Sequence, residues 1–225
     1  MPSAQVLSSG GDATSRPTFM TPTIAPAYGA MVVAAVTNRR LLGAELPILT
    51  GTGLTWIQQT TIPFAAGVYR LTIFTAERQD PNGISETINI SFDTNQAATA
   101  WVVLSFAGVV PNQGFVQFAT NTGATRNVRV PLRSFAKASN ATLYIAANTL
   151  STDGFTADAS HRSLDATGAP LMSLATTWRA GNDRNPGGVW RGTNLIASAF
   201  AAELHTIPEI PDPQFNRGIF RAKIR

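Results

Sequence analysis

The residues His161-Arg162-Ser163-Leu164-Asp165 contain the three side-chain types of a hydrolase triad. A triad is assembled in space, and its serine usually stands on a constrained turn such as Gly-x-Ser-x-Gly. The chain has no such turn. We therefore interpret His161 as a solvated loop residue and His205 as a residue at a strand end, and we expect a protein that is not an enzyme.

The residues that could bind a metal are few and poorly spaced. The chain has no cysteine and two histidines, which excludes disulfides and thiolate sites and leaves too few imidazoles for a typical zinc site. Asp153, Asp158 and Asp165 miss the every-other-residue spacing of an EF-hand calcium loop. No glycine-rich phosphate loop occurs. We expect no metal and no cofactor.

One stretch has the composition of a binding loop. The segment "WRAGNDRNPGGVWRG", residues 178–192, carries two Trp-Arg pairs around a glycine turn. Trp and Arg dominate interface hot spots, and a Trp face stacks on sugars. Two interpretations stay open: the loop binds a ligand, or each Trp packs into the edge of a sandwich. The candidate surface-binding residues are Trp178, Arg179, Arg184, Trp190 and Arg191.

The C-terminus has the pattern of a strand outside the core. Residues 207–225, "IPEIPDPQFNRGIFRAKIR", begin with prolines that stiffen an extended exit and end by alternating apolar with basic side chains. An alternating terminal strand must pair with a sheet edge, of its own domain or of an adjacent subunit, or else remain disordered. The predicted assembly arm contains Phe215, Arg217, Ile219, Phe220, Arg221, Lys223, Ile224 and Arg225.

Between these segments the sequence indicates strands. Period-2 alternation on both sides of Asp80-Pro81-Asn82-Gly83 predicts a β-hairpin of half-buried strands over 74–92, and 151–170 reads as a long surface loop. The 194–204 segment is alanine-rich, so a short helix competes with a strand there. Strands are predicted at 28–37, 53–61, 99–108, 115–119, 126–132, 141–149 and 194–204.

Composition defines the fold class and its limits. The chain has 225 residues, of which 44% are hydrophobic and 13% charged, enough for a substantial core beneath a sparsely charged surface. Recurrent strands separated by turns predict an all-β protein, a single antiparallel sandwich over 28–206. Residues 1–27, rich in Ser, Gly, Thr and Pro, are expected to form an extended N-terminal arm ordered by a neighbour, and 207–225 the C-terminal arm.

The charge distribution bears on the class of partner. The formal net charge is +4, and its arginines are scattered without an aromatic-basic stripe, so we do not expect specific nucleic-acid binding. No apolar stretch approaches the roughly 18 residues that suggest a spanning helix. The N-terminus lacks the basic and apolar regions of a signal peptide. The expectation is a soluble protein without a membrane partner.

Several stretches together resemble a known group of proteins. The succession "AMVVAAVTN", "GTGLTWIQQTT", "VYRLTIFTAE" and "ETINISFDTNQAATAWVVLSFAGVV" resembles a jelly-roll-like β-sandwich found in tailed-bacteriophage virion proteins and in some bacterial surface proteins. Trp56 and the Phe106-Ala107-Gly108 turn carry the match, which covers about residues 30 to 110. The motifs are structural and transfer no catalytic residue.

The resemblance implies a structural component of a phage virion, either a capsid decoration protein or a tail protein. Its expected location is the virion, and its expected partners are further copies of itself and other virion structural proteins. In this hypothesis the sheet is a rigid body whose arms dock on neighbouring subunits. The alternative is a carbohydrate-binding or host-adhesion module in which Trp178 and Trp190 contact a host-surface glycan.

Overall fold

The computed structural model describes residues 2–51, 53–78, 85, 87–110, 115–150 and 154–207. Within these residues every regular element is a β-strand, and no helix long and apolar enough to cross a membrane is found. All strand pairs are antiparallel, which confirms the predicted all-β class.

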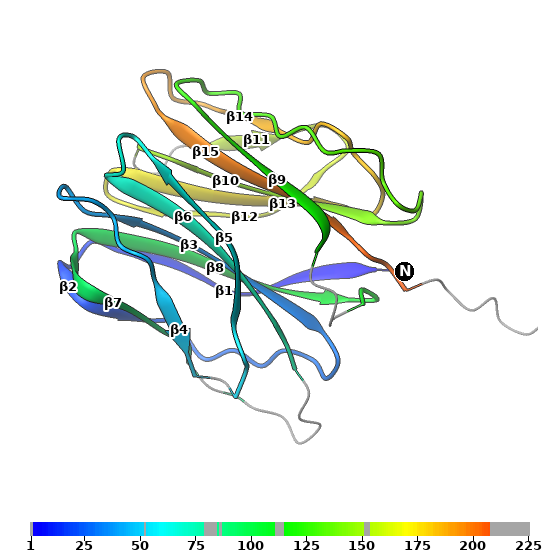
Figure 1. Cartoon of the computed structure of the whole chain (residues 1–225), viewed down its shortest axis with the longest axis horizontal. Coiled ribbons are helices and arrows are strands. Elements are labelled where there is room, and N and C mark those ends of the chain that lie inside the picture. Colours follow the sequence, from blue (N-terminus) through cyan, green and yellow to red (C-terminus); the bar gives the residue numbers. More distant parts are fainter. Residues whose placement is uncertain are drawn as a thin grey trace, which may run out of the picture.

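Two five-stranded inner sheets form the centre of the molecule (Figure 1). The first inner sheet has the order β1 (Ser3–Asp12), β8 (Ala98–Ala107), β3 (Met31–Arg39), β6 (Tyr69–Glu77) and β5 (Ile57–Phe64). The second inner sheet has the order β12 (Arg162–Ala169), β13 (Met172–Arg179), β10 (Ala141–Asn148), β15 (Ala197–Leu204) and β9 (Phe115–Gly123).

A small outer sheet covers each inner sheet on the side away from the centre (Figure 1). The first outer sheet consists of β2 (Arg16–Met20), β7 (Asn89–Gln96) and β4 (Ile48–Thr50), and the second of β11 (Phe155–Ala157) and β14 (Gly188–Trp190). Three hydrophobic clusters fill the spaces between the four layers. The inner sheets are therefore buried on both faces, which explains why β3, β8, β10 and β15 are nearly continuous apolar runs.

The two halves of the chain have the same strand order. Numbered within its half, the first inner sheet runs 1-8-3-6-5 and its outer sheet 2-7-4. In the second half, β9 is counted as strand 1, residues 126–132 as strand 2, and β10 to β15 as strands 3 to 8. The second inner sheet then also has the order 1-8-3-6-5, and its outer sheet has the order 7-4. In the first half, strand 2 pairs with strand 7. Residues 126–132 take the corresponding place in the second half, because the amides of Val130 and Leu132 donate to the carbonyls of Pro186 and Arg184, just before β14.

Most predicted strands exist. The segments at 28–37, 53–61, 99–108, 115–119 and 141–149 correspond to β3, β5, β8, β9 and β10 with shifted ends. The alanine-rich 194–204 segment contains strand β15 and not a helix, because its alanines pack between two layers. Residues 126–132 follow β14 through backbone hydrogen bonds without forming a regular strand.

The predicted hairpin over 74–92 is wrong. Its two strands, β6 and β7, belong to different sheets, so they do not pair. Residues 79–84 lie outside the described residues, but the chain between the strands is long enough to pass from one layer to the next. The alternation of apolar and polar residues predicted the strands correctly, and Ile88, Ile90 and Phe92 share a buried face.

Two segments predicted to lie outside the sheets are parts of them. Residues 3–12 and 16–20 are strands β1 and β2, paired within the chain with β8 and β7, so a neighbour is not needed to order them. The 151–170 segment contains β11 and β12, and its last residues pair with β13. Both segments look polar because they form sheet edges and outer strands, where most residues of β1 and β12 are only partly buried.

The inner sheets come closest where edge strands β1 and β12 meet. A Cβ atom built on Gly11 would lie 2.0 Å from the carbonyl oxygen of Gly168, which is backbone and cannot rotate away. Gly11 is therefore needed for close approach of the two halves, whereas a Cβ atom on Gly168 would meet the backbone of the adjacent strand β13. Phe106 and Trp178, on the facing sheets, lie 6.0 Å apart by ring centroids and fill the adjoining core.

We predict that Gly11→Ala lowers the free energy of unfolding by about 1–3 kcal/mol, because the added methyl group forces the two backbones apart. Chemical denaturation measured by tryptophan fluorescence tests this. Gly181→Ala is the matched control, since a Cβ there meets nothing closer than 3.7 Å. Equal stability of the two variants would contradict the role assigned to the close approach.

Candidate functional site

The two tryptophans of the predicted binding loop are buried. Trp178 is the penultimate residue of strand β13, lies in the core between the inner sheets and is 5% exposed. Trp190 ends β14 and is 1% exposed, packed edge-on against Phe155 at 4.8 Å between ring centroids. Each Trp therefore packs into the sandwich, and neither presents a ring face on which a sugar could stack.

The arginines of the same loop lie apart from a common site. The guanidinium of Arg179 donates to the hydroxyl of Ser160 at 3.1 Å. Arg184 and Arg191 are exposed, and their backbone groups hold neighbouring segments, with Leu132 donating to the Arg184 carbonyl and Arg191 donating to Gly154. The structure thus separates the five candidate surface-binding residues into two buried anchors and three distributed cations.

His161 is buried, which makes its interpretation as a solvated residue wrong. Its Nε2 atom lies 3.1 Å from Oδ2 of Asp183 and its Nδ1 atom 3.3 Å from the hydroxyl of Thr177. Neither Ser163 nor Asp165 contacts the imidazole in these bonds. Thr177 is fully buried, so its hydroxyl cannot meet a substrate. The arrangement joins the turn before β12 to β13 and to the loop that follows it.

Burial lowers the pKa of His161, and the carboxylate of Asp183 opposes this only in part. The neutral imidazole is therefore favoured in the folded state. Below the ordinary pKa of 6.5 the unfolded chain binds a proton that the folded protein does not, so stability falls as the pH decreases.

We predict that the contribution of His161 to the free energy of unfolding does not change with pH above about pH 7.5. Below about pH 6.5 this contribution declines as the pH falls. Urea denaturation between pH 5 and 8 measures this. In His161→Gln the decline should be smaller than in the parent, while in His205→Gln, which changes a histidine that is not buried, it should persist. An identical slope in the parent and in His161→Gln would contradict the prediction.

Acidic residues considered as calcium ligands are engaged elsewhere or lie apart. Asp158 receives two hydrogen bonds from the guanidinium of Arg129, at 2.8 and 2.9 Å. Asp153 lies outside the described residues. Among the residues that the structure describes, no group of three or more potential metal ligands occurs.

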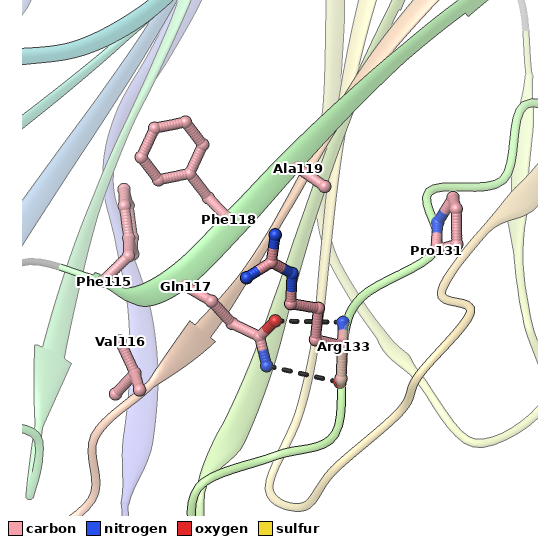
Figure 2. A pocket seen from close by; sticks show the side chains of 7 residues that line it. All are labelled: Phe115, Val116, Gln117, Phe118, Ala119, Pro131 and Arg133. Carbon is pink, nitrogen blue, oxygen red and sulfur yellow. Dashed lines mark hydrogen bonds between the residues drawn. The ribbon is translucent and has the colours of Figure 1, made fainter.

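A groove with partly exposed apolar side chains runs along strand β9, the edge of the second inner sheet. The groove has a volume of about 460 Å³ and lies between β9 and the 131–133 segment (Figure 2). Val116 and Phe118 are 40% and 43% exposed. The Phe118 ring packs on Phe115 and Phe200 at the rim of the central core. Arg133 supplies a cation at the opposite side.

A second hollow adjoins the first at Phe115 and Val116. It has a volume of about 380 Å³ and is also lined by Ala136, Lys137, Asn140 and His205. The ammonium of Lys137 lies 3.0 Å from Nε2 of His205. The two hollows form one surface, which we call the β9 groove, with an apolar floor and two basic side chains, Arg133 and Lys137, beside it.

Glu203 holds the wall of the β9 groove in place. Its carboxylate is fully buried and accepts hydrogen bonds from Nε2 of Gln117 (2.7 Å), from the backbone amide of Ala136 (2.8 Å) and from the side-chain amide of Asn140. Gln117 in turn accepts a hydrogen bond from the backbone amide of Arg133 at 3.0 Å and donates to its carbonyl (Figure 2). This network fixes the segment that borders β9.

We predict that Glu203→Ala lowers the free energy of unfolding by about 2–4 kcal/mol, because it leaves buried donors without an acceptor. Glu203→Gln, which keeps the shape and one acceptor, should cost less. Denaturation of both variants tests the order, and hydrogen exchange at Ala136 should rise in Glu203→Ala. Full stability of Glu203→Ala would contradict the assigned role.

The sequence analysis did not select the β9 groove. A usable signal was present, because "FVQFATNTG" contains no proline and no charged residue, and such residues normally protect an edge strand. The predicted assembly-arm residues, Phe215 to Arg225, lie outside the described residues.

Comparison with known proteins gives no assignment. No model of a known protein family matches the chain, and neither a curated protein nor a solved structure matches it.

Proposed function

We propose that this protein is a non-enzymatic structural subunit of a phage virion, of the capsid-decoration or tail type, that assembles with further copies of itself. The observation that carries the proposal is the β9 groove, where an edge strand nine residues long presents exposed Val116 and Phe118 beside an open hollow. Exposed edges with apolar side chains are templates for pairing with another chain.

The strand order supports this class of protein. Orders 1-8-3-6 and 2-7-4 within one half correspond to the two sheets of a jelly roll in which the fifth strand has joined the first sheet. Jelly rolls occur in viral capsid proteins and in lectin domains. Because a fold hosts many functions, the choice between these two classes depends on the surface.

The surface favours assembly over sugar binding. A carbohydrate site of the expected kind needs an exposed aromatic face. Trp178 and Trp190 are buried, whereas apolar side chains exposed on β9 suit contact with another protein. The four-layer body, with its inner sheets buried on both faces, is suited to a load-bearing subunit with contacts at its edges.

A second exposed apolar feature adds to the contact surface. Leu41 and Leu42, after β3, are 71% and 87% exposed on a short loop. The loop is held by an ion pair between Arg40 and Glu45 at 2.8 Å, so its leucines are presented on a fixed support. Paired exposed leucines of this kind mark interaction surfaces.

We predict that the purified full-length protein forms a defined oligomer or assemblies that grow with concentration, because the alternating sequence of its C-terminal segment suits pairing with the free edge of β9. Size-exclusion chromatography with light scattering, over a hundredfold concentration range, measures this. A chain ending at Ile207 should be a folded monomer by circular dichroism, since the strands β1 to β15 pair without residues 208–225.

A full-length protein that remains monomeric at all concentrations would contradict assembly through copies of this chain. Specific binding of the folded full-length protein on a glycan array would favour the carbohydrate-binding module instead. The chromatography and the array therefore separate the two classes.

A further inference from the structure

The two side edges of the central sandwich are closed differently. The repeated strand order makes β1 equivalent to β9 and β5 equivalent to β12. At one side β1 packs on β12, where Gly11 and Gly168 bring the backbones together. The opposite side therefore carries β5 and β9, the other edge strand of each sheet. There the second half exposes Val116 and Phe118, and β5 exposes Ile57.

The two strands at the open side differ in their protection against pairing. β5 contains Pro63, a residue that typically blocks an edge. β9 has neither proline nor charge, its pairing with β15 is irregular at Val116, and among the described residues it pairs on one side only, with β15. The open position is thus beside β9, and its occupant should be an extended strand with apolar side chains at alternate positions.

We propose that the C-terminal segment 214–225 of a second copy of this chain adds to β9 as an antiparallel strand. This inference rests on the function proposed above. The segment alternates Phe220, Ala222 and Ile224 with basic residues, so its apolar face can lie on the same side of the sheet as Phe118 (Figure 2) while its basic face lies on the other side. Its alternating sequence predicts a strand, and it lies outside the described residues.

The position of the chain exit favours a second copy over the chain's own tail. Leu204 pairs with Phe115 and the amide of Ile207 donates to Gly108, so the chain leaves at the Phe115 end of β9. An antiparallel strand of the same chain would first have to reach the Gly123 end, about 30 Å away for nine residues. The linker 208–213 spans at most about 20 Å.

Basic side chains on both surfaces repel each other, but the burial of apolar side chains contributes more to the free energy of association. Arg133 and Lys137 border the β9 groove, and Arg221, Lys223 and Arg225 belong to the added segment. Repulsion between exposed charges is weak and is screened by salt, whereas covering each large apolar side chain contributes several times more. Association should therefore strengthen with added salt, the reverse of the behaviour of an acidic partner.

The test uses full-length variants that lack one of the two contact elements. Val116→Lys blocks the receiving edge, and Phe220→Lys blocks the donated strand. Each alone should weaken self-association at least tenfold. Mixed in equal amounts they should form one-to-one complexes, because each supplies the element that the other lacks. Phe118→Lys is the second edge variant if Val116→Lys fails to fold.

Two controls match these variants. Leu171→Lys replaces an exposed leucine in the turn between β12 and β13, away from β9, and should leave association unchanged. Arg221→Gln changes the opposite face of the donated strand and should leave association unchanged or raise it. Light scattering and circular dichroism are recorded for every variant at 50 mM and 500 mM salt.

Recovery of complexes on mixing, together with stronger association at high salt, is the expected result. If oligomers form and neither Val116→Lys nor Phe220→Lys weakens them, the proposed strand addition is wrong while the assembly function stands. If variants fail to complement each other, or if salt weakens association, exchange of this strand between copies is also wrong. A monomeric parent protein overturns both proposals.

Discussion

Burial of both faces of the two inner sheets is the constraint on which the rest of this structure depends. A sheet with one wet face can carry alternating polar side chains, but β3, β8, β10 and β15 cannot, because another layer packs on each side. Small side chains are needed where layers must come close. The alanines of β10, β13 and β15 that face the outer cluster with Trp190 and Tyr144 are Ala146, Ala175, Ala197, Ala199 and Ala201.

The same constraint explains how polar groups are distributed. Several polar side chains that enter the layered interior are hydrogen-bonded and tie loops to strands. His161 is bound between Thr177 and Asp183, and Glu203 collects three donors from three segments. Such groups resemble catalytic constellations in their chemistry, but their burial makes them structural anchors. The side chains that can contact other molecules lie at the edges of the sheets.

In a layered protein, the backbone hydrogen-bonding groups that remain unpaired lie at the edges of the sheets. Doubling of one strand order gives two equivalent side edges, and the chain closes one of them through the glycines of β1 and β12. The equivalent side remains open beside β9, with a groove whose wall is fixed by Glu203. An open edge on a rigid body is a natural place for contacts between subunits, and this links the fold to the proposed assembly function.

The sequence by itself determined the all-β class and the location of most strands, because side-chain alternation and long apolar runs are local properties. It also gave the correct alternative for Trp178 and Trp190, which pack into the sandwich. Only the tertiary structure decided which strands pair, so the expected hairpin of β6 and β7 is divided between two sheets and the expected N-terminal arm is strands β1 and β2. Pairing, burial of His161 and exposure of β9 depend on segments distant in sequence, and local patterns do not encode those contacts.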